Sequence, residues 1–144
     1  MQSSSASSCT VLLIEDDPEQ LAFWSNALRN CSSHYAVLEA AGGQEGLDLF
    51  RQQKVDCVLL DLDLSDSSGF QSLLDLIPDR RRPEIAVLIL SRLWNPTLAD
   101  MALQNGAHAY LIKQHTSVDA LDEAIKNAIS SVATALGERP KVCS

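Results

Sequence analysis

The stretch VLLDLDLSDSSG, residues 58–69, decides the fold and points to the chemistry of this chain. Its first half is an apolar run, which is typical of a strand that is buried on both faces of a sheet. Its second half places Asp61, Asp63 and Asp66 directly after that run. Because a carboxylate at the tip of a buried strand is costly unless its charge has a use, the stretch predicts a strand that carries a functional site at its carboxyl end.

Short apolar runs alternate with amphipathic segments along the rest of the chain. The runs that predict strands are residues 10–14, 35–40, 57–62, 85–90 and 109–112. The segments that predict helices are residues 18–30, 42–53, 69–77 and 95–106, and a last helix that begins near Thr116 or Ser117. Strict alternation of this kind predicts an α/β fold, a doubly wound (βα)5 sandwich of three layers with a five-stranded parallel sheet. In such folds the site lies outside the carboxyl ends of the strands.

Two helix starts carry clear sequence signals. Before the helix at 18–30, Asp17 is the expected N-cap, Pro18 takes the first helical position, and Gln20 stands where a capping box would place it. Before the helix at 95–106, Asn95 and Pro96 form the same cap-and-proline pair.

Length and composition bound the protein further. The 144 residues suggest one domain, and we expect residues 1–9 to be a disordered tail, residues 10–135 the domain, and residues 136–144 a tail or the start of a linker. A net charge of −8 argues against nucleic acid as a direct partner. No apolar run reaches the roughly 20 residues of a membrane helix, and no secretory signal is evident. The four cysteines match no zinc pattern, which favours a reducing compartment, the cytoplasm.

Polar residues follow four of the five predicted strands. They are Glu15 and Asp16 after the first, Asp61 and Asp63 after the third, Ser91 after the fourth, and Lys113 after the fifth. If the first and third strands are neighbours, three carboxylates converge, and a hard cation such as Mg²⁺ would relieve their repulsion. A carboxylate beside Mg²⁺ can attack phosphorus to form an aspartyl phosphate, with a lysine and a hydroxyl to hold the phosphoryl oxygens.

Four segments in chain order resemble one known family. VLLIEDDP (11–18), DCVLLDLDLSDSSG (56–69), AVLILSR (86–92) and GAHAYLIK (106–113) are similar to the motifs of the receiver domain of two-component response regulators, the CheY-like superfamily. The resemblance covers roughly residues 10–135. It implies a flavodoxin-like sheet in the order 2-1-3-4-5 and a cytoplasmic signalling phosphoprotein of a phosphorelay that is not an enzyme in its own right.

The resemblance also implies a role for each motif residue. Asp61 would be the phosphoacceptor. Asp16 would bind Mg²⁺ directly and Glu15 largely through water, while Asp63 would contribute its backbone carbonyl. Lys113 would pair with a phosphoryl oxygen. Ser91 would be the switch hydroxyl, and Tyr110 the aromatic residue coupled to it.

The same resemblance implies partners. A histidine kinase or a phosphotransfer protein would supply the phosphoryl group. An output domain or protein would read the surface formed by the fourth helix, the fifth strand and the fifth helix, where a homodimer could also form on phosphorylation. No contact with nucleic acid or membrane is expected.

Several residues depart from the family pattern. Gln114 replaces the usual proline after Lys113, which leaves open whether that peptide bond is cis. Ser65 replaces a common proline in the acidic loop. Arg92, followed by Leu93, stands where a small residue is usual, so it could block access to the pocket or hold the phosphoryl group, and we expect slow loss of the phosphoryl group.

Two alternatives stay open at this point. The chain could be a pseudo-receiver, a binding module with the fold but no phosphorylation. Asp61-x-Asp63-x-Ser65 also mimics the D-x-D-x-T nucleophile motif of haloacid-dehalogenase-like phosphatases, in which the second aspartate is a general acid. That motif normally follows the first strand, whereas here it follows the third.

Overall fold

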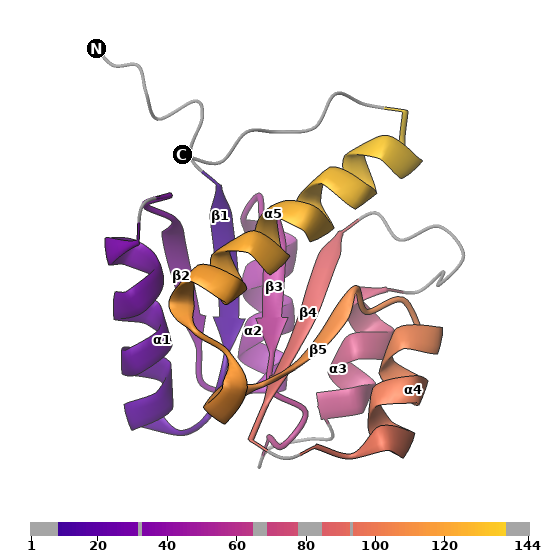
Figure 1. Cartoon of the computed structure of the whole chain (residues 1–144), viewed down its shortest axis with the longest axis horizontal. Helices are drawn as coiled ribbons and strands as arrows, with labels where there is room; N and C mark the ends of the chain where they lie inside the picture. Colours follow the sequence, from indigo (N-terminus) through magenta and orange to yellow (C-terminus); the bar gives the residue numbers. More distant parts are fainter. Residues whose placement is uncertain (1–8, 32, 65–68, 78–84, 93, 138–144) are drawn as a thin grey trace.

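The computed structural model describes residues 9–31, 33–64, 69–77, 85–92 and 94–137, and its centre is a five-stranded parallel sheet in the order β2-β1-β3-β4-β5 (Figure 1). The strands are β1 (Thr10–Ile14), β2 (Ala36–Ala40), β3 (Cys57–Leu60), β4 (Ala86–Ser91) and β5 (Ala109–Ile112). This sheet confirms the predicted fold class and strand order.

Helices cover both faces of the sheet, and each face has its own apolar core. The helices are α1 (Pro18–Asn30), α2 (Gly43–Gln52), α3 (Gly69–Leu76), α4 (Pro96–Gln104) and α5 (Val118–Ala135). On one face Trp24 and Leu28 of α1 pack with Leu121 and Ile125 of α5. On the other face the core includes residues of α3 and α4, with α2 packed against it. The result is the three-layer sandwich that the alternating sequence pattern predicts.

The pairing of β1 with β3 positions the acidic residues. The two strands run parallel with Ile14 opposite Leu60, and the Asp61 backbone N–H donates to the Ile14 carbonyl at 3.1 Å. Glu15 and Asp61 are the next residues along the two strands, so they leave the sheet side by side. β3 ends at Leu60, two residues before the predicted end at 62, and Asp61 therefore belongs to the loop at the tip of the strand.

The helix caps follow the sequence signals, with one correction. Asp17 accepts from the Glu19 N–H at 3.0 Å, and Asn95 accepts from the Leu98 N–H at 3.1 Å. The predicted capping box with Gln20 is wrong in its partner, because the Asp17 N–H donates instead to Glu15 Oε2 at 3.2 Å. The Glu15 carboxylate thus accepts a backbone hydrogen bond at the start of α1.

The two ends of the chain need separate description. Residues 1–8 and 138–144 lie outside the described part of the structure, as does the predicted loop residue Asp66. Cys9 is fully buried in the core of the α1 and α5 face. Cys9 is disulfide-bonded, whereas Cys31 and Cys57 are free thiols. Within the described residues, no helix is long and apolar enough to cross a membrane.

A cluster of hydrogen bonds ties α5 to the loop before β2. Asp122 of α5 accepts from the Ser33 hydroxyl at 2.7 Å and from the Tyr35 hydroxyl, and Lys126 lies 3.5 Å from the same carboxylate. Burial by itself would raise the pKa of Asp122, but these hydrogen bonds and the lysine outweigh it and lower the pKa below the usual value. The charged carboxylate is therefore the form that anchors α5.

Asp122→Asn should test this anchor. We expect the substitution to lower the free energy of unfolding by about 1–3 kcal/mol at neutral pH, the scale of lost hydrogen bonds to a charged acceptor. Because the folded-state pKa is depressed, the stabilisation is present above the unfolded-state value of 3.8 and disappears as the pH falls through the folded-state pKa. Urea unfolding of both proteins at pH 7 and at pH 3 measures it. A difference that stays the same at both pH values would contradict the role of the charge.

Gly69, the first residue of α3, is required by close approach of backbone to backbone. A Cβ atom there would lie 2.4 Å from the Leu62 Cα and 2.7 Å from the Asp61 carbonyl oxygen. The φ of Gly69 lies outside the left-handed region, so the constraint at this position is space. A Cβ at Gly46 would meet only the side chain of Ile14, at 2.4 Å.

Gly69→Ala should therefore destabilise the protein more than Gly46→Ala. The alanine at position 69 has to displace the backbone that carries Asp61, whereas the alanine at position 46 displaces the flexible end of an isoleucine. We expect a loss of about 1–3 kcal/mol for Gly69→Ala, typical of overpacking, measured by urea unfolding. Equal losses for the two variants would show that the loop backbone can give way.

Candidate functional site

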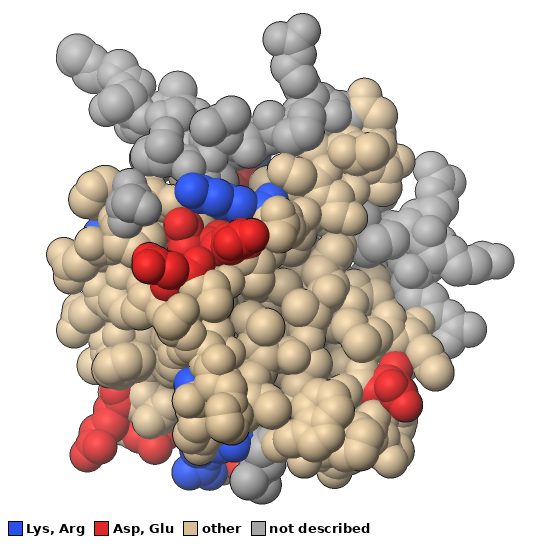
Figure 2. Space-filling view, viewed as in Figure 1, with Lys and Arg blue, Asp and Glu red and all other residues tan. Residues whose placement is uncertain are grey.

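Three charged side chains are buried together at the carboxyl ends of the strands. Glu15 follows β1, Asp61 follows β3 and Lys113 follows β5, with exposed fractions of 3%, 5% and 8%. Figure 2 shows charged atoms both above and below a largely uncharged middle, and the lower ones lie at the edge toward which the strands of Figure 1 point. Buried charges are costly unless they are paired, so this cluster marks the site.

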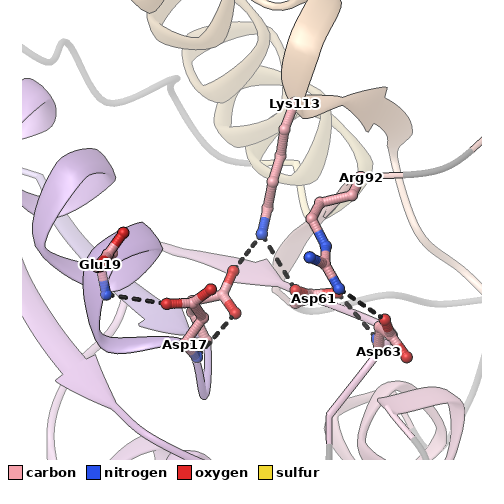
Figure 3. A network of polar contacts seen from close by, with 7 residues as sticks. Asp17, Glu19, Asp61, Asp63, Arg92 and Lys113 are labelled. Atoms are coloured by element: carbon pink, nitrogen blue, oxygen red, sulfur yellow. Dashed lines mark hydrogen bonds and ion pairs between the residues drawn. The ribbon is translucent and has the colours of Figure 1, made fainter.

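Lys113 is shared between the two buried carboxylates (Figure 3). Its Nζ forms an ion pair with Glu15 Oε1 and a second with Asp61 Oδ2 at 3.1 Å. One ammonium thus faces two carboxylates, and these three groups carry one excess negative charge. The structure brings these three predicted residues together.

The excess charge affects the protonation of Glu15. Burial raises the pKa of its carboxyl above the usual value, and the neighbouring Asp61 adds to this, although the hydrogen bond from Lys113 and the one from the Asp17 N–H partly oppose it. A carboxylate with a raised pKa at a strand end is typical of a functional site, because burial and like charge there serve chemistry instead of stability.

Asp61 also receives a hydrogen bond from its own loop. The Asp63 backbone N–H donates to Asp61 Oδ1 at 2.8 Å, so both oxygens of the carboxylate are held in place. The Asp63 side chain is 71% exposed, and its Oδ2 pairs with Arg92 Nη2 at 3.4 Å. The two aspartates of the D-x-D pattern therefore have different surroundings, one buried and one at the surface.

A small cavity lies beside the site. It has a volume of about 150 Å³ and is lined by Leu62, Asp63, Ser91, Arg92, Asn95, Leu98 and Tyr110. Ser91 is buried at the end of β4, and the half-buried ring of Tyr110 packs edge-on against Trp94 at 5.7 Å between ring centroids. The predicted switch hydroxyl and the predicted aromatic residue therefore line the same cavity.

The Lys113–Gln114 peptide bond is trans. Lys113 begins a short 3-10 helix, Lys113–His115, which Thr116 closes by donating its N–H to the Lys113 carbonyl at 3.5 Å. Because proline disfavours helical geometry in the residue before it, Gln114 permits this turn where a proline would oppose it. The trans bond answers the question that the replacement of proline by Gln114 left open.

The donor set suits Mg²⁺ chemically. The residues near Asp61 offer carboxylate and carbonyl oxygens, and the cluster contains no thiolate or imidazole. Among the described residues, however, no three acidic, histidine or cysteine side chains already converge on one point as a cation site. Asp16 is half-buried next to Glu15. In this arrangement the Lys113 ammonium is paired with the carboxylates of Glu15 and Asp61.

Two features of the site were missed at the level of sequence. The sequence does place Arg92 after Ser91, but its ion pair with Asp63 depends on how β3 and β4 align their ends. Glu15 was expected to bind Mg²⁺ largely through water, and in the structure it binds both Lys113 and the backbone at the start of α1. The signal that could have revealed it is a glutamate two residues before an N-cap aspartate.

Comparison with known proteins supports one family. The model of the response regulator receiver domain matches residues 11–126. The transcriptional regulatory protein GlrR of Escherichia coli (strain K12) is 34% identical over 129 residues, which cover 90% of this chain and 28% of that protein. A probable cyclic di-GMP phosphodiesterase of Vibrio cholerae serotype O1 is 28% identical over 113 residues, which cover 78% of this chain and 25% of that protein.

A solved structure shows the same fold. The CheY-like receiver domain protein of Methanospirillum hungatei JF-1 superposes with a TM-score of 0.77 at 24% identity, covering 89% of this chain and 98% of that one. The chain belongs to the family of response regulator receiver domains, a family of signalling phosphoacceptors in two-component systems. It spans about a quarter of the length of the two curated relatives.

Lys113→Met and Asp61→Asn should change stability in opposite directions. Removing the lysine leaves two buried carboxylates without their cation, and we expect a loss of about 3 kcal/mol or more. Removing the Asp61 charge leaves Glu15 and Lys113 as a balanced pair, and we expect a stability equal to wild type or above it. Urea unfolding at pH 7 checks both. A large loss of unfolding free energy for Asp61→Asn would contradict the claim that excess negative charge destabilises the cluster.

Proposed function

We propose that Asp61 accepts a phosphoryl group from a phosphohistidine of a histidine kinase or a phosphotransfer protein. An oxygen of the Asp61 carboxylate attacks phosphorus, and an O–P bond forms as the N–P bond of the donor breaks. The imidazole nitrogen leaves with the electron pair of that bond. The observation that carries this proposal is a buried carboxylate at a strand tip, held by Lys113 on one oxygen and by the Asp63 N–H on the other.

Each neighbouring residue has a proposed role in the transfer. Lys113 pairs with a phosphoryl oxygen and thereby offsets the charge that arrives on Asp61. Glu15 and Asp16, the Asp61 carboxylate and the Asp63 backbone carbonyl would hold Mg²⁺, which when bound neutralises phosphoryl charge. Asp17 is left out of this set because its side chain caps α1.

The proposed output is a change at the surface of α4, β5 and α5. Ser91 and Tyr110 line the cavity next to Asp61, so a hydroxyl drawn toward the phosphoryl group would change the space available to the aromatic ring. Tyr110 already contacts the exposed Trp94 just before α4. A partner domain, a separate protein or a second copy of the chain would read this face in the cytoplasm.

The two alternatives fit the site less well. A pseudo-receiver would not need a lysine buried against two carboxylates, an arrangement that costs desolvation free energy. In a haloacid-dehalogenase-like phosphatase the Asp63 carboxyl would act as a general acid, but it is largely exposed and paired with Arg92. The surroundings of Asp61 and Asp63 therefore favour the phosphoacceptor.

Acetyl phosphate with Mg²⁺ tests the proposal directly. The wild-type protein should gain about 80 Da, the mass of one phosphoryl group held as an acyl phosphate, as measured by intact-mass spectrometry. Asp61→Asn should not gain it. Asp63→Asn is the matched control, since its backbone carbonyl is unchanged, and it should keep the gain, whereas a general acid at this position would be lost.

Two results would contradict the phosphoacceptor. One is a folded wild-type protein that gains no mass, which would favour the pseudo-receiver. The other is steady turnover of a phosphomonoester that depends on Asp63, which would favour the phosphatase. The lifetime of the phosphoryl group can be followed in the same samples after the donor is removed, and we expect slow loss.

A further inference from the structure

Arg92 lines two cavities, each of which also contains a residue that is hydrogen-bonded to Asp61. It follows the buried Ser91 at the end of β4 and lines the cavity of about 150 Å³ that contains Ser91 and Tyr110. It also lines a second cavity of about 230 Å³, together with Gln20, Phe23, Trp24, Lys113 and Gln114. Arg92 therefore borders both the cavity of the predicted switch residues and the cavity that Lys113 lines.

The present partner of the arginine is weakly bound. Arg92 Nη2 lies 3.4 Å from Asp63 Oδ2, and the two side chains are 57% and 71% exposed. Exposed pairs with a single long contact contribute little, because water screens them and two long side chains must be held in one geometry. The guanidinium can therefore leave Asp63 at small cost when a stronger anion comes within reach.

Phosphorylation would supply such an anion. Lys113 already serves Glu15 and Asp61, so the two buried carboxylates and one ammonium carry a net charge of about −1 before any phosphoryl group arrives. A phosphoryl group adds further negative charge and acceptor oxygens that suit the planar fork of arginine better than a single carboxylate contact does. The guanidinium pairs with Asp63, the residue whose backbone N–H binds Asp61 Oδ1 at 2.8 Å, and Figure 3 draws the three side chains in one network of contacts.

We propose that Arg92 is a phosphoryl-binding residue of this receiver, which exchanges the Asp63 carboxylate for the phosphoryl oxygens on Asp61. The proposal rests on the proposed function of Asp61. It adds a second cationic side chain to the site, from the residue that follows β4, and it frees the Asp63 side chain whenever Asp61 is modified. Release of the Asp63 side chain in the loop after β3 thereby signals the state of Asp61 without any movement of Ser91.

Beryllofluoride with Mg²⁺ is the probe, since it stands in for a phosphoryl group on an aspartate without covalent transfer. We expect Arg92→Ala to weaken the beryllofluoride Kd about tenfold, the scale of one lost charge-assisted contact, as measured by titration calorimetry on the full chain. Arg92→Lys keeps the charge but not the fork, and should fall between the two. Arg29→Ala is the matched control, because Arg29 also forms a surface pair, with Glu39 at 3.3 Å, and should bind like wild type.

Two further measurements distinguish phosphoryl binding by Arg92 from a structural role of its ion pair with Asp63. Without beryllofluoride, Arg92→Ala should unfold at the wild-type temperature, because its pair with Asp63 is exposed. Asp63→Asn, which frees the guanidinium, should bind beryllofluoride at least as tightly as wild type. If the ion pair itself closed the site, Asp63→Asn would weaken binding as Arg92→Ala does.

The outcomes divide clearly. A Kd for Arg92→Ala within about twofold of wild type, a Kd for Arg92→Lys equal to wild type, or a lowered unfolding temperature without the probe would each overturn the role of Arg92. Failure of the wild-type protein to bind beryllofluoride, with Asp61→Asn behaving identically, would instead refute the phosphoacceptor and this role with it. Weakened binding confined to Arg92 variants supports the exchange.

Discussion

The structure depends on one ammonium group shared by two buried carboxylates. Lys113 reaches both Glu15 and Asp61 only because β1, β3 and β5 end at the same edge of one parallel sheet. The excess negative charge costs stability, and buried charge of this kind is typical of a functional site. Glu15 also accepts a hydrogen bond from the Asp17 backbone N–H at the start of α1. The same residue therefore belongs to the charged cluster and to the helix start.

The contacts around the cluster become more exposed with distance from the sheet. Close to the sheet, Gly69 lets α3 approach the backbone of Asp61 and Leu62, and hydrogen bonds hold both oxygens of the Asp61 carboxylate. Farther out, the Asp63–Arg92 pair is exposed and weak. The proposed phosphoryl transfer would use both, because its nucleophile has to be held in place while the surrounding side chains change partners.

Much of the fold could be predicted because its signals are local. Alternating apolar runs predicted all five strands, and Asp17, Asn95 and their following prolines predicted two helix starts. The strand at 57–62 was predicted two residues too long, since apolar Leu62 continues the pattern although the ladder stops at Leu60. Gln20 has the spacing of a capping box, but the Asp17 N–H binds Glu15 instead. The spacing of Gln20 alone cannot show that another acceptor takes its place.

The sequence by itself determined the fold class, the edge of the sheet that carries the site, and the candidate residues Glu15, Asp61 and Lys113, because hydrophobic periodicity and strand-end polarity are written in short segments. Tertiary structure alone decided how those charges pair. Whether Lys113 binds one carboxylate or two depends on the strand order and on the trans bond before Gln114, and the Arg92–Asp63 contact depends on the register of β3 and β4. These are long-range distances, which packing sets and which no local pattern contains.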